Sequence, residues 1–274
     1  MYRVLKNELK RGIFNKWTLL SFLCVAVFCI MHFMEVYDSC VFIDDIGKEF
    51  GYIGVEGVCE ATPYDQWILF SPNQHIVIIF FIMPILATLP YGTSFYSEMK
   101  IGYVKQMVSR MSMKTYMRAK YIATFITGGM VVVVPMLAQF FALATILPLH
   151  KPYRYYMAII GEETFCIDLF YEHPMIYTLF RILLVFVVAG LLATLALLVS
   201  KHIYNYFSVF ITPFVLSFML IFLSRVTGVG EIDFSATLHA QTNSQYNYSI
   251  LFVEIIILFV CTYFGFVSSK KEVY

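Results

Sequence analysis

The chain has 274 residues and a formal net charge of +1; 60% of its residues are hydrophobic and only 14% are charged. An ordinary soluble domain contains about 25% charged residues. The composition therefore excludes an ordinary soluble domain, and nothing in it indicates a nucleic-acid partner.

The apolar residues form six runs long enough to cross a bilayer as a helix, which takes roughly 17–25 residues. The runs cover about residues 17–34, 75–94, 121–147, 175–199, 203–223 and 248–267. Pro84 and Pro90 interrupt the second run, but proline is tolerated in membrane helices where neighbouring groups satisfy the freed carbonyls. The sequence predicts an all-α integral membrane protein with six transmembrane helices, and one membrane domain over residues 1–274.

The N-terminal residues 1–16 precede the first run and carry an apolar stripe. At 100° per residue one side collects Tyr2, Leu5, Leu9, Ile13 and Trp17. This pattern predicts a helix that lies in the membrane interface with basic residues toward the headgroups. The alternative is a positive flank that only orients the first span.

Charge is distributed unequally between the connections. With the N-terminus inside, the inner segments 1–16, 95–120, 201–202 and 268–274 hold fourteen Lys and Arg and three acids. The outer segments 35–74, 148–174 and 224–247 hold four Lys and Arg and fourteen acids. Because Lys and Arg concentrate on the cytoplasmic side, we expect both termini to be cytoplasmic and the protein to lie in the cell (plasma) membrane.

The outer loops 35–74 and 148–174 are the acidic ones. Their acids either form a vestibule that attracts cationic substrates or remain there because Lys and Arg are excluded from that side. The first loop contains Cys40 and Cys59, and the second contains Cys166. A Cys40–Cys59 disulfide is one pairing that an oxidising location allows, but sequence alone does not settle the pairing.

The inner segment 95–120 carries six basic residues and one acid, Glu98. Apolar residues recur in it every four positions, from Phe95 to Met107, and a bend near Ser109–Ser112 would divide it into two short helices. A connection between two helices needs only about 2–8 residues. We therefore interpret this segment as a docking element; the alternative is a solvated positive loop.

The stretch "FYSEMKIGYVKQMVSRMSMKTYMRAKY" resembles the segment between spans two and three of type-2 ATP-binding-cassette (ABC) transporter permeases. That segment begins with an acid and a glycine and ends in Ser-Arg and Lys, here Glu98, Gly102, Ser109, Arg110 and Lys120. The resemblance extends over the whole chain in topology, because permeases of this family have an N-terminal interfacial helix, six spans and cytoplasmic ends. In motif it covers only about 27 residues.

The resemblance implies that residues 95–120 are the coupling segment that fits a groove on a separate ATPase subunit. Methionine and aromatic side chains would supply contact area, and charged ones would fix the orientation. The implied contact residues are Glu98, Met99, Gly102, Tyr103, Lys105, Met107, Arg110 and Met111.

ATP hydrolysis is expected on that partner, because the chain contains no G-x-x-x-x-G-K-[ST] phosphate loop. We expect no catalytic residue, metal or cofactor on this chain, with ATP and Mg²⁺ on the ATPase. Six spans rarely enclose a polar path alone. Two ATPase copies and a second permease subunit, identical or related, are therefore the expected partners, besides membrane lipid.

Two charges, Arg181 and Glu254, fall within predicted spans, each about six residues from the outer end. A charge in the bilayer centre costs roughly 2.5–3.5 kcal/mol on insertion scales. An Arg181–Glu254 ion pair would lower this cost; the alternative for Arg181 is to extend to the outer interface.

Aromatic residues recur in the fifth predicted span. By the resemblance, spans two and five line the translocation path, and Phe207, Phe210, Phe214 and Phe218 would form an apolar lining. Phenylalanine that faces lipid explains the same residues.

These patterns predict an exporter permease for a peptide (bacteriocin, toxin or antimicrobial peptide) or a small amphipathic compound. The alternative is a channel, sensor or immunity membrane protein without an ATPase. An intramembrane enzyme is disfavoured, because Glu162–Glu163 lacks the arginine of the E-E-x-x-x-R pattern (position 167 is Ile167) and no H-E-x-x-H occurs.

Overall fold

The computed structural model describes residues 2–50, 62–71, 73–152, 165–239 and 248–268, and for residues 40–50 and 268 it describes the backbone alone. The described residues form helices and turns, with no strand. The predicted Cys40–Cys59 pairing lies outside this description.

Five helical stretches are long and apolar enough to cross a membrane, so the protein is an all-α membrane protein. They belong to α2 (Lys16–Phe50), α6 (Met113–Ile146), α8 (Pro174–Val199), α9 (Tyr206–Thr227) and α11 (Tyr248–Tyr263), which continues into η2 (Phe264–Ser268). Each overlaps one of the predicted spans; α6 ends one residue before the predicted end, and α9 begins three residues after the predicted start.

The second predicted span, residues 75–94, is a shorter helix than expected. α3 (Gln74–Thr88) has 15 residues, which is about 22 Å at 1.5 Å per residue, against a hydrocarbon core of about 30 Å. The Asn73 side chain caps its start by accepting from the Ile76 N–H at 2.9 Å. Pro90 lies just beyond its end, and a proline cannot donate the hydrogen bond that would continue a helix.

The first predicted outer loop, residues 35–74, differs from the expectation at both ends. α2 continues to Phe50. Residues 17–46 contain no glycine or proline to end it, and the helix also passes through Gly47. At the other end Trp67, Ile68 and Phe70 are fully buried. The Trp67 indole donates to the Met136 carbonyl at 2.9 Å, and the Ile68 N–H donates to Gln139 at 3.4 Å. The last part of the predicted loop therefore belongs to the hydrophobic core.

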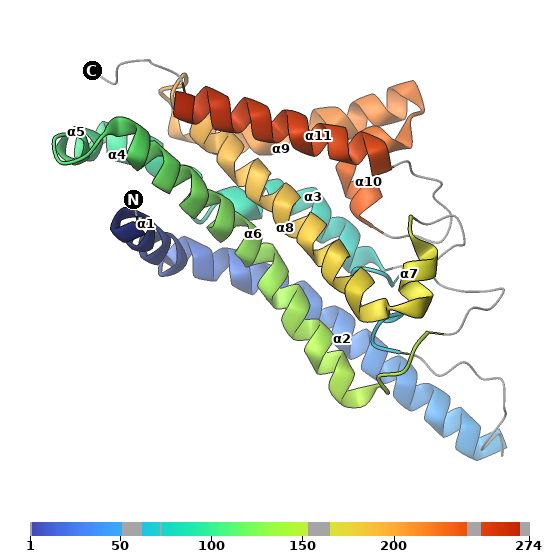
Figure 1. Ribbon diagram of the computed structural model, residues 1–274. Coiled ribbons are helices and arrows are strands. Elements are labelled where there is room, and N and C mark those ends of the chain that lie inside the picture. Colours follow the sequence, from blue (N-terminus) through green and yellow to red (C-terminus); the bar gives the residue numbers. More distant parts are fainter. Residues whose placement is uncertain (1, 51–61, 72, 153–164, 240–247, 269–274) are drawn as a thin grey trace.

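The shorter helices gather at the two ends of the bundle (Figure 1). α1 (Tyr2–Ile13), α4 (Ser94–Lys100) and α5 (Tyr103–Val108) lie at the same end as η2. α7 (Ile167–Glu172) and α10 (Phe234–Leu238) lie at the opposite end, and η1 (Gly230–Ile232) directly precedes α10.

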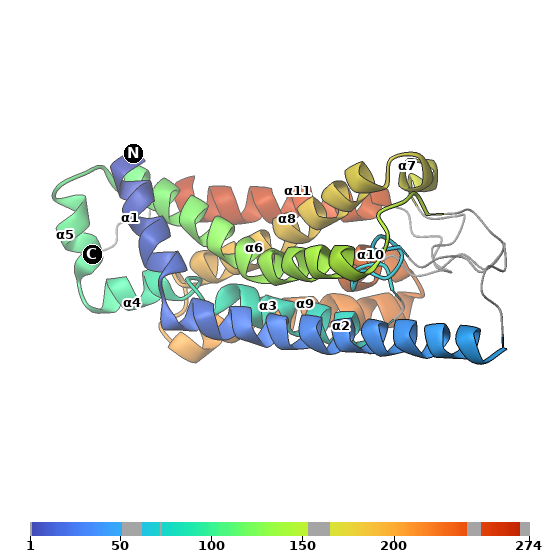
Figure 2. The same ribbon diagram turned by 90° about the horizontal axis from the view of Figure 1, so that it is seen from below.

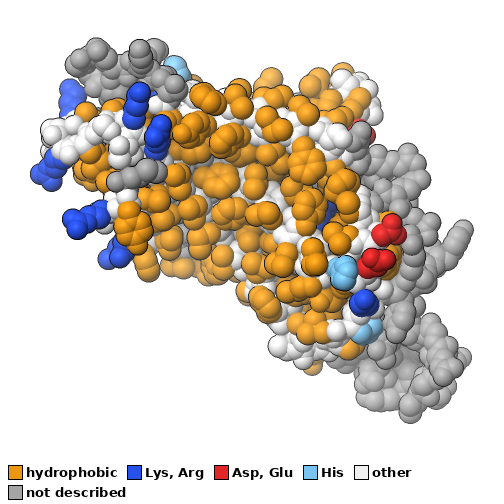
Figure 3. All heavy atoms as spheres, viewed as in Figure 1, with side chains coloured by type: hydrophobic (Ala, Val, Ile, Leu, Met, Phe, Trp, Pro, Cys, Tyr) orange, Lys and Arg blue, Asp and Glu red, His pale blue; other side chains and the backbone are white. Residues whose placement is uncertain are grey.

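Charged side chains also separate between the ends. Figure 3 shows Lys and Arg gathered around α1 and α5, Asp and Glu at the opposite end, and a broad hydrophobic surface between them. This is the arrangement of a protein whose middle is surrounded by lipid.

α8 is the central helix, and α3, α6, α9 and α11 all pack against it. Figure 2 shows α2 along the side of the bundle opposite α11, where it packs on α3 and α6. Two glycines allow the α6–α8 contact to be close. A methyl group at Gly128 would lie 2.5 Å from the Ala193 methyl, and one at Gly190 would lie 2.7 Å from the Phe125 carbonyl oxygen. Small residues at such contacts are typical of membrane helix pairs.

We expect Gly190→Ala to destabilise the bundle, because its methyl group would meet backbone that cannot move aside. The expected loss is about 1–3 kcal/mol, measured as a lower melting temperature of the detergent-purified protein. Leu183→Val, at an exposed position of the same helix, is the control and should melt like the wild type. Equal melting of both variants would contradict the close contact.

Candidate functional site

The segment 94–112 forms a projection of two short helices, α4 and α5, at the end of the bundle that contains α1 (Figure 2). The predicted bend at Ser109–Ser112 is present, because α5 ends at Val108 and the Ser112 side chain caps α6. A second bend, which the periodicity did not predict, lies at Gly102. Its φ of 74° is a left-handed conformation that favours glycine, so the glycine itself was the available signal.

The inner face of the projection packs on the bundle. Phe95 and Val104 are buried with Tyr116, Met117 and Phe266, and the rings of Phe95 and Phe266 are 5.1 Å apart. Three methionines implied as partner contacts, Met99, Met107 and Met111, are partly buried against this same cluster. In this chain they fix the projection to α6 and η2.

Beneath the projection lies a cluster of buried charges that joins three helices. We call Glu8 and Arg11 of α1, Glu98 of α4 and Lys120 of α6 the charge cluster. The Lys120 ammonium lies 3.0 Å from Glu8 Oε2 and 2.8 Å from Glu98 Oε2. The Arg11 guanidinium lies 2.7 Å from Glu98 Oε1 and 3.3 Å from Glu8 Oε1. Two carboxylates and two cations thus balance one another.

Two tyrosines complete the hydrogen bonding of the charge cluster. Tyr91 donates to Glu8 at 2.5 Å and accepts from Lys120 at 3.0 Å. Tyr116 donates to Glu98. These hydrogen bonds and the ion contacts together allow the charges to remain in a low-dielectric interior. Glu98 Oε1 has the ion contact with Arg11 but no hydrogen bond.

Burial differs among the four charged groups. Lys120 is 0%, Glu8 1% and Glu98 3% exposed, whereas Arg11 is at the rim. Burial alone would lower the pKa of Arg11, but the carboxylates of Glu98 and Glu8 outweigh it and raise that pKa. Arg11 also stacks 5.0 Å from the Tyr103 ring centroid, which ties α5 to α1.

Glu98 had been implied as a contact to the ATPase, but its carboxylate is used within the chain. Its place in the charge cluster makes it a positioning residue for α4. Sequence reasoning missed its partners Arg11 and Lys120, and it missed Glu8, which shares both cations. The available signals were a lone acid among five basic residues in segment 1–16 and a lysine directly before an apolar run.

The outer face of the projection and of the α6 start is exposed and basic. We call it the basic face; it comprises Lys100, Ile101, Lys105, Val108, Arg110, Lys114 and Arg118. Ile101 is 74% exposed and Val108 is 39% exposed. Of the implied contact residues, Lys105 and Arg110 lie on this face, and Gly102 and Tyr103 are half-buried.

The predicted Arg181–Glu254 ion pair does not form, and Arg181 does not extend to the interface either. Arg181 is 1% exposed and donates to the Tyr248 hydroxyl and, at 2.6 Å, to the Leu238 carbonyl. Its guanidinium also lies 5.4 Å from the Tyr248 ring centroid. Tyr248 and the end of α10 therefore accept the hydrogen bonds of Arg181, and Glu254 takes no part in them.

The four phenylalanines of the fifth span lie toward the outside of the single chain. Phe207 is 65% and Phe218 is 50% exposed, while Phe210 and Phe214 are half-buried. Phe214 packs edge-to-face on Phe81 of α3 at 5.4 Å. Their surface is open to lipid or to another subunit.

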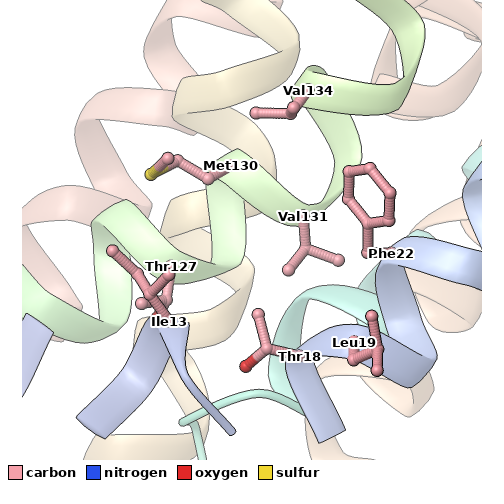
Figure 4. Close-up of a pocket in the computed structure, with 8 residues that line it drawn as sticks. All are labelled: Ile13, Thr18, Leu19, Phe22, Thr127, Met130, Val131 and Val134. Carbon is pink, nitrogen blue, oxygen red and sulfur yellow. The ribbon is translucent and has the colours of Figure 1, made fainter. Parts of the chain in front are cut away.

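A cavity of about 260 Å³ lies where α1 turns into α2 and both face α6 (Figure 4). Its walls are Ile13, Thr18, Leu19 and Phe22 on one side and Thr127, Met130, Val131 and Val134 on the other. Both threonine hydroxyls donate to backbone carbonyls, so this cavity has no free polar group for chemistry. Among the described residues, no group of His, Cys, Asp and Glu could hold a metal ion.

No family model matches the chain, and no curated protein or solved structure matches it either.

We expect Lys120→Met to destabilise the protein strongly, because Glu8 and Glu98 would remain buried without their shared cation. Breaking a buried ion pair costs about 3–5 kcal/mol, and the detergent-purified variant should melt earlier or fail to accumulate. Lys114→Met, at an exposed position of α6, is the matched control.

A second variant tests the reason for the loss. Adding Glu98→Gln to Lys120→Met removes one uncompensated carboxylate, so the double variant should be more stable than Lys120→Met alone. If Lys120→Met and Lys114→Met melted alike, the charge cluster would not anchor the three helices.

Proposed function

We propose that the chain is the membrane-spanning permease subunit of an ATP-driven exporter of the type-2 ABC class, and that the α4–α5 projection receives a separate ATPase subunit. The observation that carries this proposal is the two-sided construction of the projection. Its inner face is fixed by the charge cluster, and its outer face presents basic and apolar side chains.

Such a construction suits the transmission of force. A partner that closes on ATP binding can move membrane helices only through an element that does not yield. Lys120 joins α4 directly to α6, a helix of 34 residues, and Arg11 joins both α4 and α5 to α1. A displacement of the projection would therefore reach α1 and α6 together.

The basic face is suited to an acidic groove with an apolar floor. Exposed Lys and Arg steer an acidic partner and fix its orientation, while Ile101 and Val108 offer the apolar contact that gives affinity. By the positive-inside rule, the end with α1, α4 and α5 is the cytoplasmic end, which is where ATP is available.

The complete transporter on this proposal contains two ATPase copies and a second permease subunit, identical or related, in the plasma membrane. The half-exposed phenylalanines of α9 are available for the contact between permeases. The cargo class is a peptide or a small amphipathic compound.

We expect the double variant Lys105→Glu and Arg110→Glu to lose the ATPase partner, because it reverses two exposed charges of the basic face. Vanadate-sensitive ATPase activity that copurifies with the tagged chain should fall at least about tenfold, since each lost charge contact is worth about 0.5–1 kcal/mol or more. The melting temperature of the chain alone should not change.

Lys151→Glu, an exposed lysine at the opposite end, is the matched control and should keep full activity. If no ATPase activity accompanied the wild-type chain from its own membrane, the permease proposal would fail in favour of a channel, sensor or immunity protein.

A further inference from the structure

A second cavity, of about 370 Å³, lies between α8, α9 and α11. α9 and α11 each pack on α8, but in the part of the chain that the structure describes they scarcely contact one another. The two helices therefore leave a space whose floor is α8. Leu195 and Leu198 line the floor, Leu216 and Leu220 line one wall, and Leu251 lines the other.

The one ionisable carboxyl in this apolar lining is Glu254 of α11. Its Oε2 atom is buried and has no hydrogen-bond partner, and no Lys, Arg or His among the described residues pairs with it. Arg181, the basic residue of the same region, is occupied by Tyr248 and Leu238. A carboxyl within a membrane span is costly unless a partner is provided.

The other polar groups near this carboxyl do not supply that partner. The Thr262 hydroxyl, which also lines the cavity, donates to the Leu258 carbonyl at 2.7 Å. Asp233, which is close enough to interact electrostatically with Glu254, is another acid and not a cation. Its own oxygen Oδ1 accepts from the backbone N–H and the hydroxyl of Ser235. The cavity is thus apolar, contains one carboxyl and, among the described residues, has no cation.

We propose that this cavity binds a lipophilic amine: a molecule with an apolar body that fills the leucine-lined space and a protonated primary or secondary amine that donates to Glu254. An ammonium is the group that matches, because it supplies both the missing charge and the missing N–H donor. The apolar body would gain from burial at about 25 cal/mol per Å² of apolar surface. The inference does not depend on an ATPase partner.

The test compares two probes of equal size, 4-phenylbutylamine and the neutral 4-phenylbutan-1-ol. Binding to the full-length chain is measured in phosphatidylcholine nanodiscs, with empty nanodiscs subtracted for partition into lipid. Charge-assisted hydrogen bonds contribute about 1.5–3 kcal/mol, so Glu254→Gln should weaken binding of the amine about tenfold or more. Binding of the alcohol should not change. Asp38→Asn, at an exposed acid on α2, is the control and should leave both unchanged.

Two further measurements keep the proposal open to refutation if Glu254→Gln does not fold. Leu220→Trp fills the cavity and should abolish binding of both probes. Cys261 lines the cavity and is exposed, so the amine should slow its labelling by N-ethylmaleimide in the wild-type chain, as followed by mass spectrometry.

Equal affinity of the amine for the wild type and for a folded Glu254→Gln variant would overturn the proposal. So would oxidative crosslinking of Cys261 between two chains, because a second copy would then cover the cavity. Repeating the assay with phosphatidylethanolamine in the nanodiscs separates two sources of the same chemistry. If phosphatidylethanolamine displaces the probe, the ligand of the cavity is the amine of a lipid headgroup. If binding of the probe is undiminished, the ligand is a free amine.

Discussion

The structure at the α4–α5 end depends on one interaction, the insertion of the Lys120 ammonium between the carboxylates of Glu8 and Glu98. The three residues come from α6, α1 and α4, which lie far apart in the sequence. None of these charges could remain inside without the others, since an isolated charge in the interior costs several kcal/mol. The same ion contacts therefore decide where α1 lies and which way the projection points.

Two of the acids that the structure describes, Glu98 and Glu254, lie in opposite surroundings. Glu98 is enclosed by a lysine, an arginine and a tyrosine, and this makes it a rigid structural group. Glu254 has no cation beside it among the described residues, and an apolar cavity lies in front of it. Glu98 lies in a basic segment and Glu254 in an apolar one, but the partners of each are set by what the fold places beside it.

Much of the helical layout could be predicted from the sequence, because runs of apolar residues and their length are local properties. Five of the predicted spans correspond to long apolar helices, and the bend before α6 follows from Ser112 as a cap. The predictions that differ from the structure concern features that depend on residues distant in the sequence. α2 continues well past residue 34, where no glycine or proline occurs before Gly47, but the acids after residue 34 suggested a loop. The partners of Arg181, Glu98 and Met107 are set by packing between helices, for which the spacing within one segment carries no signal.

The shortness of α3 has a consequence for the order in which the protein assembles. With only 15 helical residues, α3 is preceded by the irregular segment around Trp67 and Ile68, and α6 holds that segment in place. The Trp67 indole donates to the Met136 carbonyl, and the Ile68 N–H donates to the Gln139 side chain. Unpaired peptide groups are not tolerated in hydrocarbon. During biosynthesis, therefore, the segment before α3 reaches its final position only when α6 is present to accept these hydrogen bonds.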